Sequence, residues 1–387
     1  MRSSVGRSSF VRWGRRILVG AAAVALLSAC VPPPNLGVAA SQSGLNIPWD
    51  VQFLPSGTML YTERAGGLNA VVGGQRRLLW KPTDLVAAIE AGMMSIAVDP
   101  SYSSTRQVFV CFASTAPGNG VDDVRIARLT LDANTTTATN RTDILTGIPM
   151  NPAGELGKHS GCRLRFGPDG YLWVGTGDAA IGTAPQDPKS LAGKVLRITK
   201  TGGAAPGNMA APFDPRIESY GHRNVQGLAF RANGQAYDVE HGTGCDDEVN
   251  LLRTGGNYGW DPVPRAPGDP SYDEYTDMTD TVRHPDAIRP VWKSGCPTIA
   301  PSGGVFLNGT QWGTWNGGLV LEVLKGSELL MLKFDNTGTG VAAFSWALTN
   351  HGRLRSGTVG PDGALYVTTS NGSTDQILRV TPTDVSK

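Results

Sequence analysis

Short apolar runs alternate with polar and turn-forming residues along most of the chain. Runs of this kind, rich in Val, Ile, Phe, Tyr and Trp and bounded by Gly, Pro, Asn or Asp, are typical of β-strands. The periodicity of an amphipathic helix is almost absent, and its best candidate, residues 83–94, is short. The pattern therefore predicts an all-β fold.

One unit recurs along the sequence: an apolar strand, a turn and a second strand. In the third copy, Phe166-Gly-Pro-Asp-Gly supplies the end of one strand and the turn, and Leu172-Trp-Val begins the next strand. The copies lie roughly 45 to 75 residues apart, a spacing that fits propeller blades with loop insertions. The first strands of the six copies contain residues 53, 97, 166, 230, 305 and 359, respectively.

Six copies predict a six-bladed β-propeller with four-stranded blades. Residues 45–383 would form this domain without an internal boundary, at about 14 residues for each strand and its connection. A β-sandwich or a barrel would need far fewer strands.

The first 29 residues resemble a bacterial lipoprotein signal peptide. Five arginines and no acidic residue come first, and the apolar run at 17–27 is too short to span a bilayer as a helix. Leu27-Ser-Ala-Cys30 resembles the lipobox, whose cysteine is lipidated and begins the mature chain. We expect residues 30–44 to be a flexible tether, and the exported domain to be attached to the outer face of the cell membrane by its lipid only. An ordinary signal peptide with an incidental cysteine is the alternative.

Charge and cysteine content refine this picture. The formal charge is +1, and loss of the five arginines in residues 1–29 lowers it to about −4 (1 − 5). With no basic stripe among aromatic residues, nucleic acid is not an expected partner. The four cysteines after position 30 favour disulfides, for which three connectivities exist. We favour Cys111–Cys162, between neighbouring repeats, and Cys245–Cys296, between loops beside the motifs described below.

A histidine and an aspartate flank the third repeat. His159 precedes the first strand of the hairpin and Asp178 follows the second. Because a hairpin brings its two ends together, the two side chains should be neighbours. A carboxylate beside an imidazole fixes the tautomer of a catalytic base and raises its basicity. A surface histidine that happens to precede a strand is the alternative.

Arginines precede the fourth and sixth repeats. Arg223 lies before the fourth, while Arg353 and Arg355 alternate before the sixth, so that both side chains point to one strand face. Three guanidinium groups at one end of the channel would suit a polycarboxylate or another anion. The glycine-rich segment 240–250 offers carbonyl and carboxylate oxygens, which a hard cation such as calcium prefers.

Ten ordered motifs together resemble the glucose/sorbosone dehydrogenase family. They are Pro48-Trp-Asp, Glu63-Arg, His159-Ser-Gly-Cys, Gly175-Thr-Gly-Asp178, Gly221-His-Arg-Asn, Glu240-His-Gly, Asp247-Glu-Val-Asn, Asn257-Tyr-Gly-Trp, Ala300-Pro-Ser-Gly and Arg353-Leu-Arg. The resemblance covers residues 45–382. It implies a six-bladed propeller that oxidises an aldose-type sugar with pyrroloquinoline quinone (PQQ) and Ca²⁺. The lipobox and the four cysteines resemble, more narrowly, LppZ-type lipoproteins of actinobacteria.

The resemblance implies roles for single residues around the cofactor. His159 matches the general base and Asp178 the carboxylate that orients it. Arg223 matches the arginine over the reactive quinone carbonyl, and Asn224 is its neighbour in the pocket. The family's remaining cofactor contacts, a pair that holds the carboxylates and a lysine at the quinone edge, fall on Arg353, Arg355 and Lys325.

Two calcium sites are implied in the same way. Gly242 and Thr243 match the carbonyl ligands of the ion beside the cofactor. Glu248 and Tyr258 match a second, structural site.

The sequence also departs from the family. Cys162 replaces a usual glycine, Thr243 a common proline, and Glu90 stands where a polar cofactor contact is frequent. The alternatives to the enzyme are a non-catalytic surface propeller that binds a carbohydrate or a protein and, for a carboxylate-rich channel, a calcium-dependent lactonase. The sequence identifies neither the sugar nor the electron acceptor; substrate contacts are expected from loop 262–286.

Overall fold

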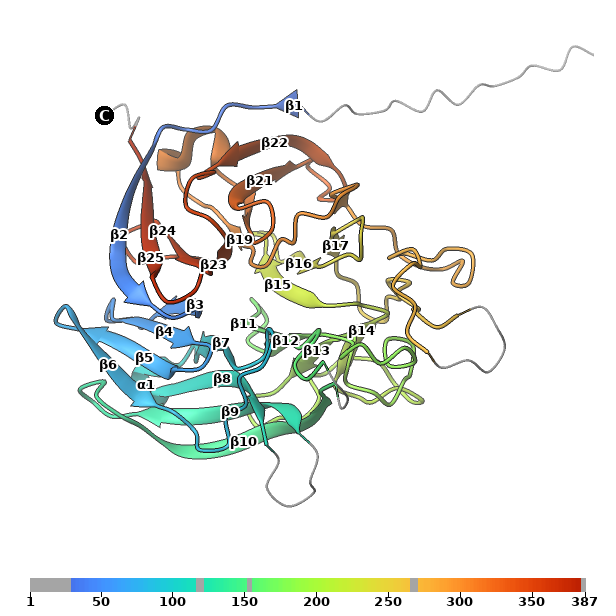
Figure 1. The fold of residues 1–387 in the computed structure, drawn as a ribbon, viewed down its shortest axis with the longest axis horizontal. Coiled ribbons are helices and arrows are strands. Elements are labelled where there is room, and N and C mark those ends of the chain that lie inside the picture. The colour runs from blue at the N-terminus through green and yellow to red at the C-terminus, as the bar shows by residue number, and fades with distance from the viewer. Residues whose placement is uncertain (1–28, 116–121, 152–154, 265–270, 384–387) are drawn as a thin grey trace, which may run out of the picture.

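The computed structural model describes residues 29–115, 122–151, 155–264 and 271–383. Six β-sheets stand around a central channel like the blades of a propeller (Figure 1). The expected signal peptide lies almost entirely outside the described residues. Among the described residues, no helix has both the length and the apolar character needed to cross a membrane.

The first three blades follow one another directly along the chain. Blade one consists of β3 (Pro48–Phe53), β4 (Met59–Glu63), β5 (Gly67–Val72) and β6 (Gln75–Trp80). Blade two consists of β7 (Met93–Val98), β8 (Gln107–Ser114), β9 (Asp123–Leu131) and β10 (Ala138–Pro149). Blade three consists of β11 (Gly161–Phe166), β12 (Leu172–Thr176), β13 (Lys194–Ile198) and β14 (Ile217–Tyr220).

The last two blades also contain N-terminal strands. Blade four consists of β15 (Val225–Phe230), β16 (Ala236–Glu240), β17 (Glu248–Leu251) and β18 (Trp292–Lys293). Blade five consists of β19 (Val305–Phe306), β20 (Leu319–Val323), β21 (Glu328–Phe334) and β22 (Val341–Ala347), with β1 (Ala29–Cys30) parallel to β22. Blade six consists of β23 (Leu354–Val359), β24 (Leu365–Thr369), β25 (Asp375–Pro382) and β2 (Leu36–Leu45).

The predicted six-bladed propeller is confirmed. Each strand-turn-strand repeat forms the first two strands of a blade, from β3–β4 to β23–β24. The helical elements of the described residues are the single turn α1 (Tyr102–Thr105) and the 3₁₀ segment η1 (Thr310–Trp315). The short helical pattern at 83–94 is not realised, because this segment forms turns and the start of β7.

The expected tether is shorter than predicted. Residues 36–44 belong to β2, which pairs with β25 from Leu36↔Pro382 to Leu45↔Asp375 and supplies the outermost strand of blade six. Small and polar residues suggested a linker, but an edge strand is held by its backbone hydrogen bonds and needs few apolar side chains. Cys30 is exposed and makes no disulfide.

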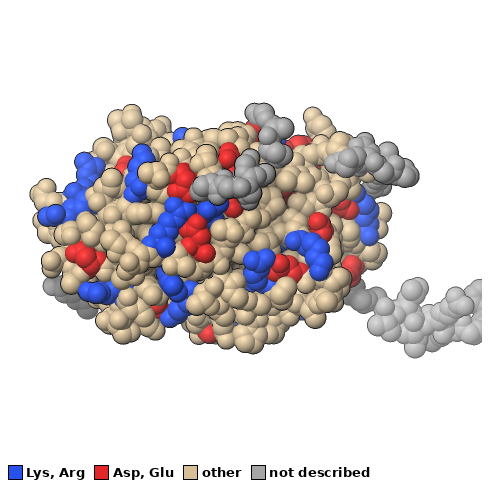
Figure 2. Space-filling view, turned by 90° about the horizontal axis from the view of Figure 1, so that it is seen from below, with Lys and Arg blue, Asp and Glu red and all other residues tan. Residues whose placement is uncertain are grey.

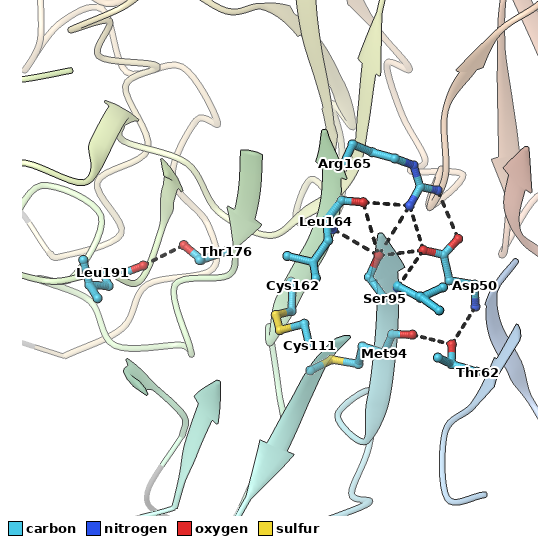
Figure 3. Close-up of a disulfide and its surroundings, with 12 residues drawn as sticks. Asp50, Thr62, Met94, Ser95, Cys111, Cys162, Leu164, Arg165, Thr176 and Leu191 are labelled. Atoms are coloured by element: carbon cyan, nitrogen blue, oxygen red, sulfur yellow. Dashed lines mark hydrogen bonds and ion pairs between the residues drawn. A yellow bond between two sulfur atoms is a disulfide. The ribbon is translucent and has the colours of Figure 1, made fainter. Parts of the chain in front are cut away.

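Apolar side chains fill the space between neighbouring blades, and both predicted disulfides are present. Cys111 of β8 and Cys162 of β11 join blades two and three within a buried cluster that includes Phe109 (Figure 3). The second disulfide, Cys245–Cys296, joins the loop after β16 to the segment after β18. Lys/Arg and Asp/Glu side chains are interspersed on the rim of the propeller (Figure 2).

Inside the channel, buried charges connect the inner strands. Asp50 of β3 is fully buried and receives Arg165 Nη1 at 2.7 Å and Nη2 at 3.0 Å (Figure 3). Ser95 of β7 donates to the same carboxylate at 2.6 Å. Burial alone would raise the pKa of Asp50, but Arg165 and Arg163 hold it well below its ordinary value. Three blades are thus joined through one carboxylate.

A second channel carboxylate has no such partner. Glu322 of β20 is fully buried, and neither of its oxygens has a hydrogen-bond partner among the described residues. Its carboxyl group is packed against Gly303 and Gly357, where an added Cβ would come within 2.0 Å of its oxygens. Burial raises the pKa of Glu322 to about 8, although the charge of Arg163 opposes the rise.

Glu322 should make folding stability depend on pH. Because the folded pKa lies above the unfolded one, the native state retains a proton that the unfolded state releases. Its contribution is full below the unfolded pKa of about 4.5 and is lost as the pH rises toward about 8, by at most ~1.4 kcal/mol per pH unit. Glu322→Gln should flatten this dependence, as measured by urea unfolding at both ends of that range. The exposed substitution Glu155→Gln is the control, and an unchanged slope in Glu322→Gln would contradict the assignment.

Candidate active site

The candidate site lies at the end of the channel where the inner strands begin. In each blade the inner strand and the next strand are antiparallel, so the start of the first and the end of the second lie together. His159, Asp178 and Arg223 occupy such positions in blades three and four, and Arg355 lies near the start of β23 in blade six.

His159 and Asp178 are neighbours, as the hairpin predicted. His159 Nδ1 lies 2.9 Å from Asp178 Oδ1, and both side chains are buried. The two chain segments approach so closely that a Cβ at Gly177 would lie 1.8 Å from the His159 carbonyl oxygen. A glycine is therefore required at 177, because any larger residue would separate the histidine from its carboxylate.

The Asp178 carboxylate is held by four groups. Besides His159, it accepts hydrogen bonds from Trp260 Nε1 at 2.7 Å, the Tyr272 hydroxyl at 2.7 Å and the Ala180 amide at 2.8 Å. Burial opposes ionisation, but the charges of His159 and Arg223 and these hydrogen bonds hold the pKa of Asp178 below its ordinary value. An ionised Asp178 fixes the proton of neutral His159 on Nδ1 and leaves the lone pair on Nε2 for a substrate.

Arg223 lies next to the His159–Asp178 pair and is held by hydrogen bonds of its backbone and its guanidinium. The Asp178 amide donates to the Arg223 carbonyl at 2.7 Å. Its guanidinium donates to the His241 carbonyl at 3.1 Å and to Glu274 Oε2 at 2.7 Å, while Nε has no partner among the described residues. Glu274 also pairs with Lys158 at 3.2 Å. The Glu274 carboxylate therefore occupies a position in which an anionic ligand could otherwise contact Arg223.

Arg353 and Arg355 differ in burial. Arg355 is 6% exposed, donates from Nε to Ser370 Oγ at 3.3 Å and leaves Nη1 buried without a partner among the described residues. Burial, together with the nearby charges of Arg353 and Arg64, lowers the pKa of Arg355 to about 10. Arg353 and Lys325 are exposed, and Lys325 Nζ donates to Thr298 Oγ1 at 3.3 Å.

Unsatisfied nitrogens mark this region as a site for an anion. Four buried side-chain nitrogens near one another have no hydrogen-bond partner among the described residues: Arg64 Nε, Arg223 Nε, His241 Nε2 and Arg355 Nη1. Burial lowers the pKa of His241 to about 4, so this ring is neutral, whereas the three arginine nitrogens are donors of positive charge. Buried polar groups are normally paired, so these arginine nitrogens indicate a missing acceptor. A ligand with several carboxylates would satisfy them.

Glu90 lies in the same region. Its carboxylate accepts hydrogen bonds from the Ser160 amide at 2.9 Å, from Asn224 Nδ2 at 3.1 Å and from Gln226 Nε2 at 2.8 Å. Glu90 thus joins Asn224 to the segment that follows His159. Position 90 retains a polar group, but its negative charge opposes a carboxylate ligand.

The expected calcium ligands lie in two places. Gly242 and Thr243 belong to a loop fixed by Asp247, whose Oδ1 accepts the Gly242 amide at 2.9 Å. Glu248 and Tyr258 are buried between blades three and four. Glu248 Oε1 accepts Thr279 Oγ1 at 2.9 Å, and the Tyr258 hydroxyl donates to the Leu251 carbonyl at 2.8 Å.

The sequence analysis did not identify three residues whose side chains contact Asp178 or Arg223. Trp260, which the sequence analysis gave only as the end of the motif Asn257-Tyr-Gly-Trp, donates to Asp178. Tyr272 and Glu274 come from the loop in which substrate contacts were expected, yet no spacing or motif marked either residue. Only the folding of this loop over His159 and Arg223 reveals them.

The fold and site define a six-bladed propeller with a histidine–aspartate pair and, near it, buried arginine nitrogens without partners among the described residues. The sequence model of the Glucose / Sorbosone dehydrogenase family matches residues 45–379, so the chain belongs to this family.

Relatives and solved structures agree with this assignment. The aldose sugar dehydrogenase YliI of Escherichia coli (strain K12) is 30% identical over 372 residues, which cover 90% of this chain and 94% of that protein. The PQQ-bound aldose sugar dehydrogenase of Streptomyces coelicolor has a TM-score of 0.70 and 30% identity, covering 91% of this chain and 99% of that one. A putative oxidoreductase (glucose dehydrogenase) of Thermus thermophilus has a TM-score of 0.74 and 34% identity, covering 89% of this chain and 100% of that one.

Proposed function

We propose that the protein oxidises an aldose-type sugar at its anomeric carbon, with PQQ as the immediate electron acceptor. The observation that carries the proposal is the buried His159–Asp178 pair beside arginine nitrogens without partners among the described residues. The E. coli and S. coelicolor relatives, named as aldose sugar dehydrogenases, support the same reaction.

The residues present fit a tricarboxylate quinone. Arg355 Nη1 and Arg223 Nε are buried donors without acceptors in the described part of the chain, and Arg353 adds a third guanidinium at the pocket edge. Lys325 is the candidate for the quinone edge. The negative charge of Glu90 is unfavourable for a carboxylate ligand, but the positive charge of Arg355 offsets it.

The roles of the side chains follow from these contacts. Nε2 of His159 takes the proton of the sugar's anomeric hydroxyl, and ionised Asp178 stabilises the resulting imidazolium. Arg223 stabilises negative charge that develops beside it. When bound, PQQ supplies the two-electron acceptor for the hydride of the same carbon. The second electron acceptor is a separate molecule.

The proposed function also includes two calcium ions. Carbonyl oxygens of Gly242 and Thr243 would hold one ion at the cofactor, and Glu248 with Tyr258 would hold a structural ion. Asp247 and the disulfide Cys245–Cys296 fix the first loop, which supports a preformed site.

The location is also a proposal. We infer that Cys30 is lipidated, as in LppZ-type lipoproteins, and that it anchors the propeller to the outer face of the cell membrane. The exposed Cys30 thiol, which makes no disulfide, is consistent with this. Mass spectrometry of the purified protein should find Cys30 as an acylated N-terminus; an unmodified Cys30 within a longer chain would contradict it.

Reconstitution tests the enzyme. The purified protein with PQQ and Ca²⁺ should acquire a quinone absorbance that an aldose bleaches. Calorimetry that finds no calcium-dependent binding of PQQ would contradict the proposal and favour the non-catalytic binding propeller.

Glu274→Gln should strengthen PQQ binding several-fold. The substitution frees Arg223 from an ion pair that a cofactor carboxyl or carbonyl must otherwise displace. Titration of the quinone absorbance measures the change. Glu155→Gln is the matched control, because Glu155 pairs with Lys158 but not with Arg223. Weaker binding in Glu274→Gln would instead make Glu274 part of the bound site.

A further inference from the structure

A buried group of metal-binding side chains lies outside the candidate active site, between blades three and four. His222 precedes β15, while Asp238 and Glu240 are on β16, and all three are at most 1% exposed. His222 Nδ1 lies 3.0 Å from Asp238 Oδ2 and 3.2 Å from Glu240 Oε1. The three ligand atoms all lie within 4.8 Å of one another.

The charge of this group is not balanced. Asp238 and Glu240 bring two negative charges, and both side chains are buried. Protonated His222 would supply one positive charge, which leaves one negative charge without a counter-charge within this group.

Unpaired oxygens point toward a missing cation. The Asp238 carboxylate is fully buried, and apart from the contact of Oδ2 with His222 Nδ1 at 3.0 Å neither oxygen accepts a well-oriented hydrogen bond from the described residues. Asn250 Oδ1, on the adjacent strand β17, has no partner there either. Buried acceptors are normally satisfied, so a cluster of unpaired oxygens beside an imidazole indicates an absent positive ligand.

The surrounding contacts are those expected around a metal ligand. His222 Nε2 lies 2.9 Å from Ser219 Oγ, so a neutral ring that donates to this oxygen keeps its Nδ1 lone pair toward the carboxylates. Tyr258 stacks on the imidazole at 4.6 Å and fixes its plane. Glu240 is held by Asn250 Nδ2 at 2.8 Å and by the Arg223 amide at 2.7 Å.

We propose that His222 Nδ1, Asp238 and Glu240 bind a divalent ion of the Zn²⁺ or Mn²⁺ class. One imidazole nitrogen with carboxylate oxygens suits these ions, whereas calcium prefers six to eight oxygen ligands. Separations of 3.0 and 3.2 Å also fit ligands on an ion with bonds of about 2.0–2.2 Å. This ligand set differs from Gly242 with Thr243 and from Glu248 with Tyr258, the positions proposed for calcium.

The ion would also support the neighbouring anion pocket. His222 is adjacent to Arg223, and Glu240 accepts the Arg223 backbone amide. An ion that fixes His222 and Glu240 therefore fixes the backbone from which the Arg223 guanidinium extends. Its role is structural, and binding requires neither PQQ nor sugar.

Metal binding to the purified protein, first stripped with a chelator, tests the proposal. Calorimetry with Zn²⁺ and Mn²⁺ should find one site, and saturation should raise the melting temperature by roughly 4 °C at 100-fold excess over Kd. X-ray absorption of the loaded protein should show one imidazole and oxygen ligands. Calcium alone should not compete for this site.

Two variants complete the test. Asp238→Asn should weaken Zn²⁺ or Mn²⁺ binding at least ~10- to 100-fold. Asp99→Asn is the matched control, because Asp99 is equally buried but pairs with Lys200 in another part of the propeller. The proposal is overturned if the stripped wild-type protein binds neither ion, or if bound zinc has no imidazole ligand. In that case His222 is a protonated partner of Asp238 and Glu240, and Asp238→Asn should not reduce metal affinity.

Discussion

His159→Ala should bind PQQ almost as tightly as the wild type, yet turn over sugar about 10²–10⁴-fold more slowly. Asp178 positions the imidazole to take a proton, and the substitution removes this base without removing a cofactor-binding arginine. Single-turnover bleaching of the quinone by an aldose, followed at several pH values, measures the effect.

The control for this variant is Tyr272→Phe. It removes one hydrogen bond to Asp178 but leaves Nδ1 of His159 paired at 2.9 Å, so turnover should fall much less. Equal losses in the two variants would show that the hydroxyl of Tyr272, rather than the imidazole, carries the proton. Unchanged turnover in His159→Ala would exclude His159 as the base.

Arg355→Met should weaken PQQ binding by roughly 10- to 100-fold, the loss expected for a charge-assisted hydrogen bond. Arg355 is buried, and its Nη1 is unpaired among the described residues. A cofactor carboxylate could therefore accept a hydrogen bond from Nη1 without competition from water. Equilibrium titration without sugar measures the change. Folding should not suffer, because methionine removes a buried charge and still covers the Trp49 ring, 5.4 Å from the guanidinium.

Arg353→Met is the matched substitution at an exposed position. Its effect on PQQ affinity should be smaller, because solvent screens the Arg353 charge. A larger loss in Arg353→Met than in Arg355→Met would reverse this assignment of the dominant contact. Circular dichroism of both variants separates cofactor loss from misfolding.

The blades were predictable because their signal is local. Each repeat contains its own strands and turn, so the sequence around Phe166 or Val359 defines a hairpin without knowledge of distant residues. The same locality brought His159 and Asp178 together, since one hairpin separates them. The disulfide Cys111–Cys162 was predictable because its two cysteines lie in consecutive repeats, which form neighbouring blades.

Other features depend on partners remote in sequence. The composition of residues 36–44 suggested a linker because the strand that holds them, β25, lies at the opposite end of the chain. Tyr272 and Glu274 acquire their contacts only when a long loop folds across two blades. The sequence likewise does not show that Glu322 is unpaired, because a single glutamate in the apolar strand Leu319–Val323 does not reveal which residues will surround its side chain.

The pairing of β2 with β25 also determines when the molecule is complete. During synthesis β2 emerges before strands β3 to β24 and β25 emerges after them, so blade six lacks its outer pairing until β25 has been made. Until then β2 has an unpaired edge, and the ring remains open between blades one and six. The nascent protein therefore depends on protection from strand-to-strand association until β25 emerges, and a truncation near residue 375 would leave an open ring.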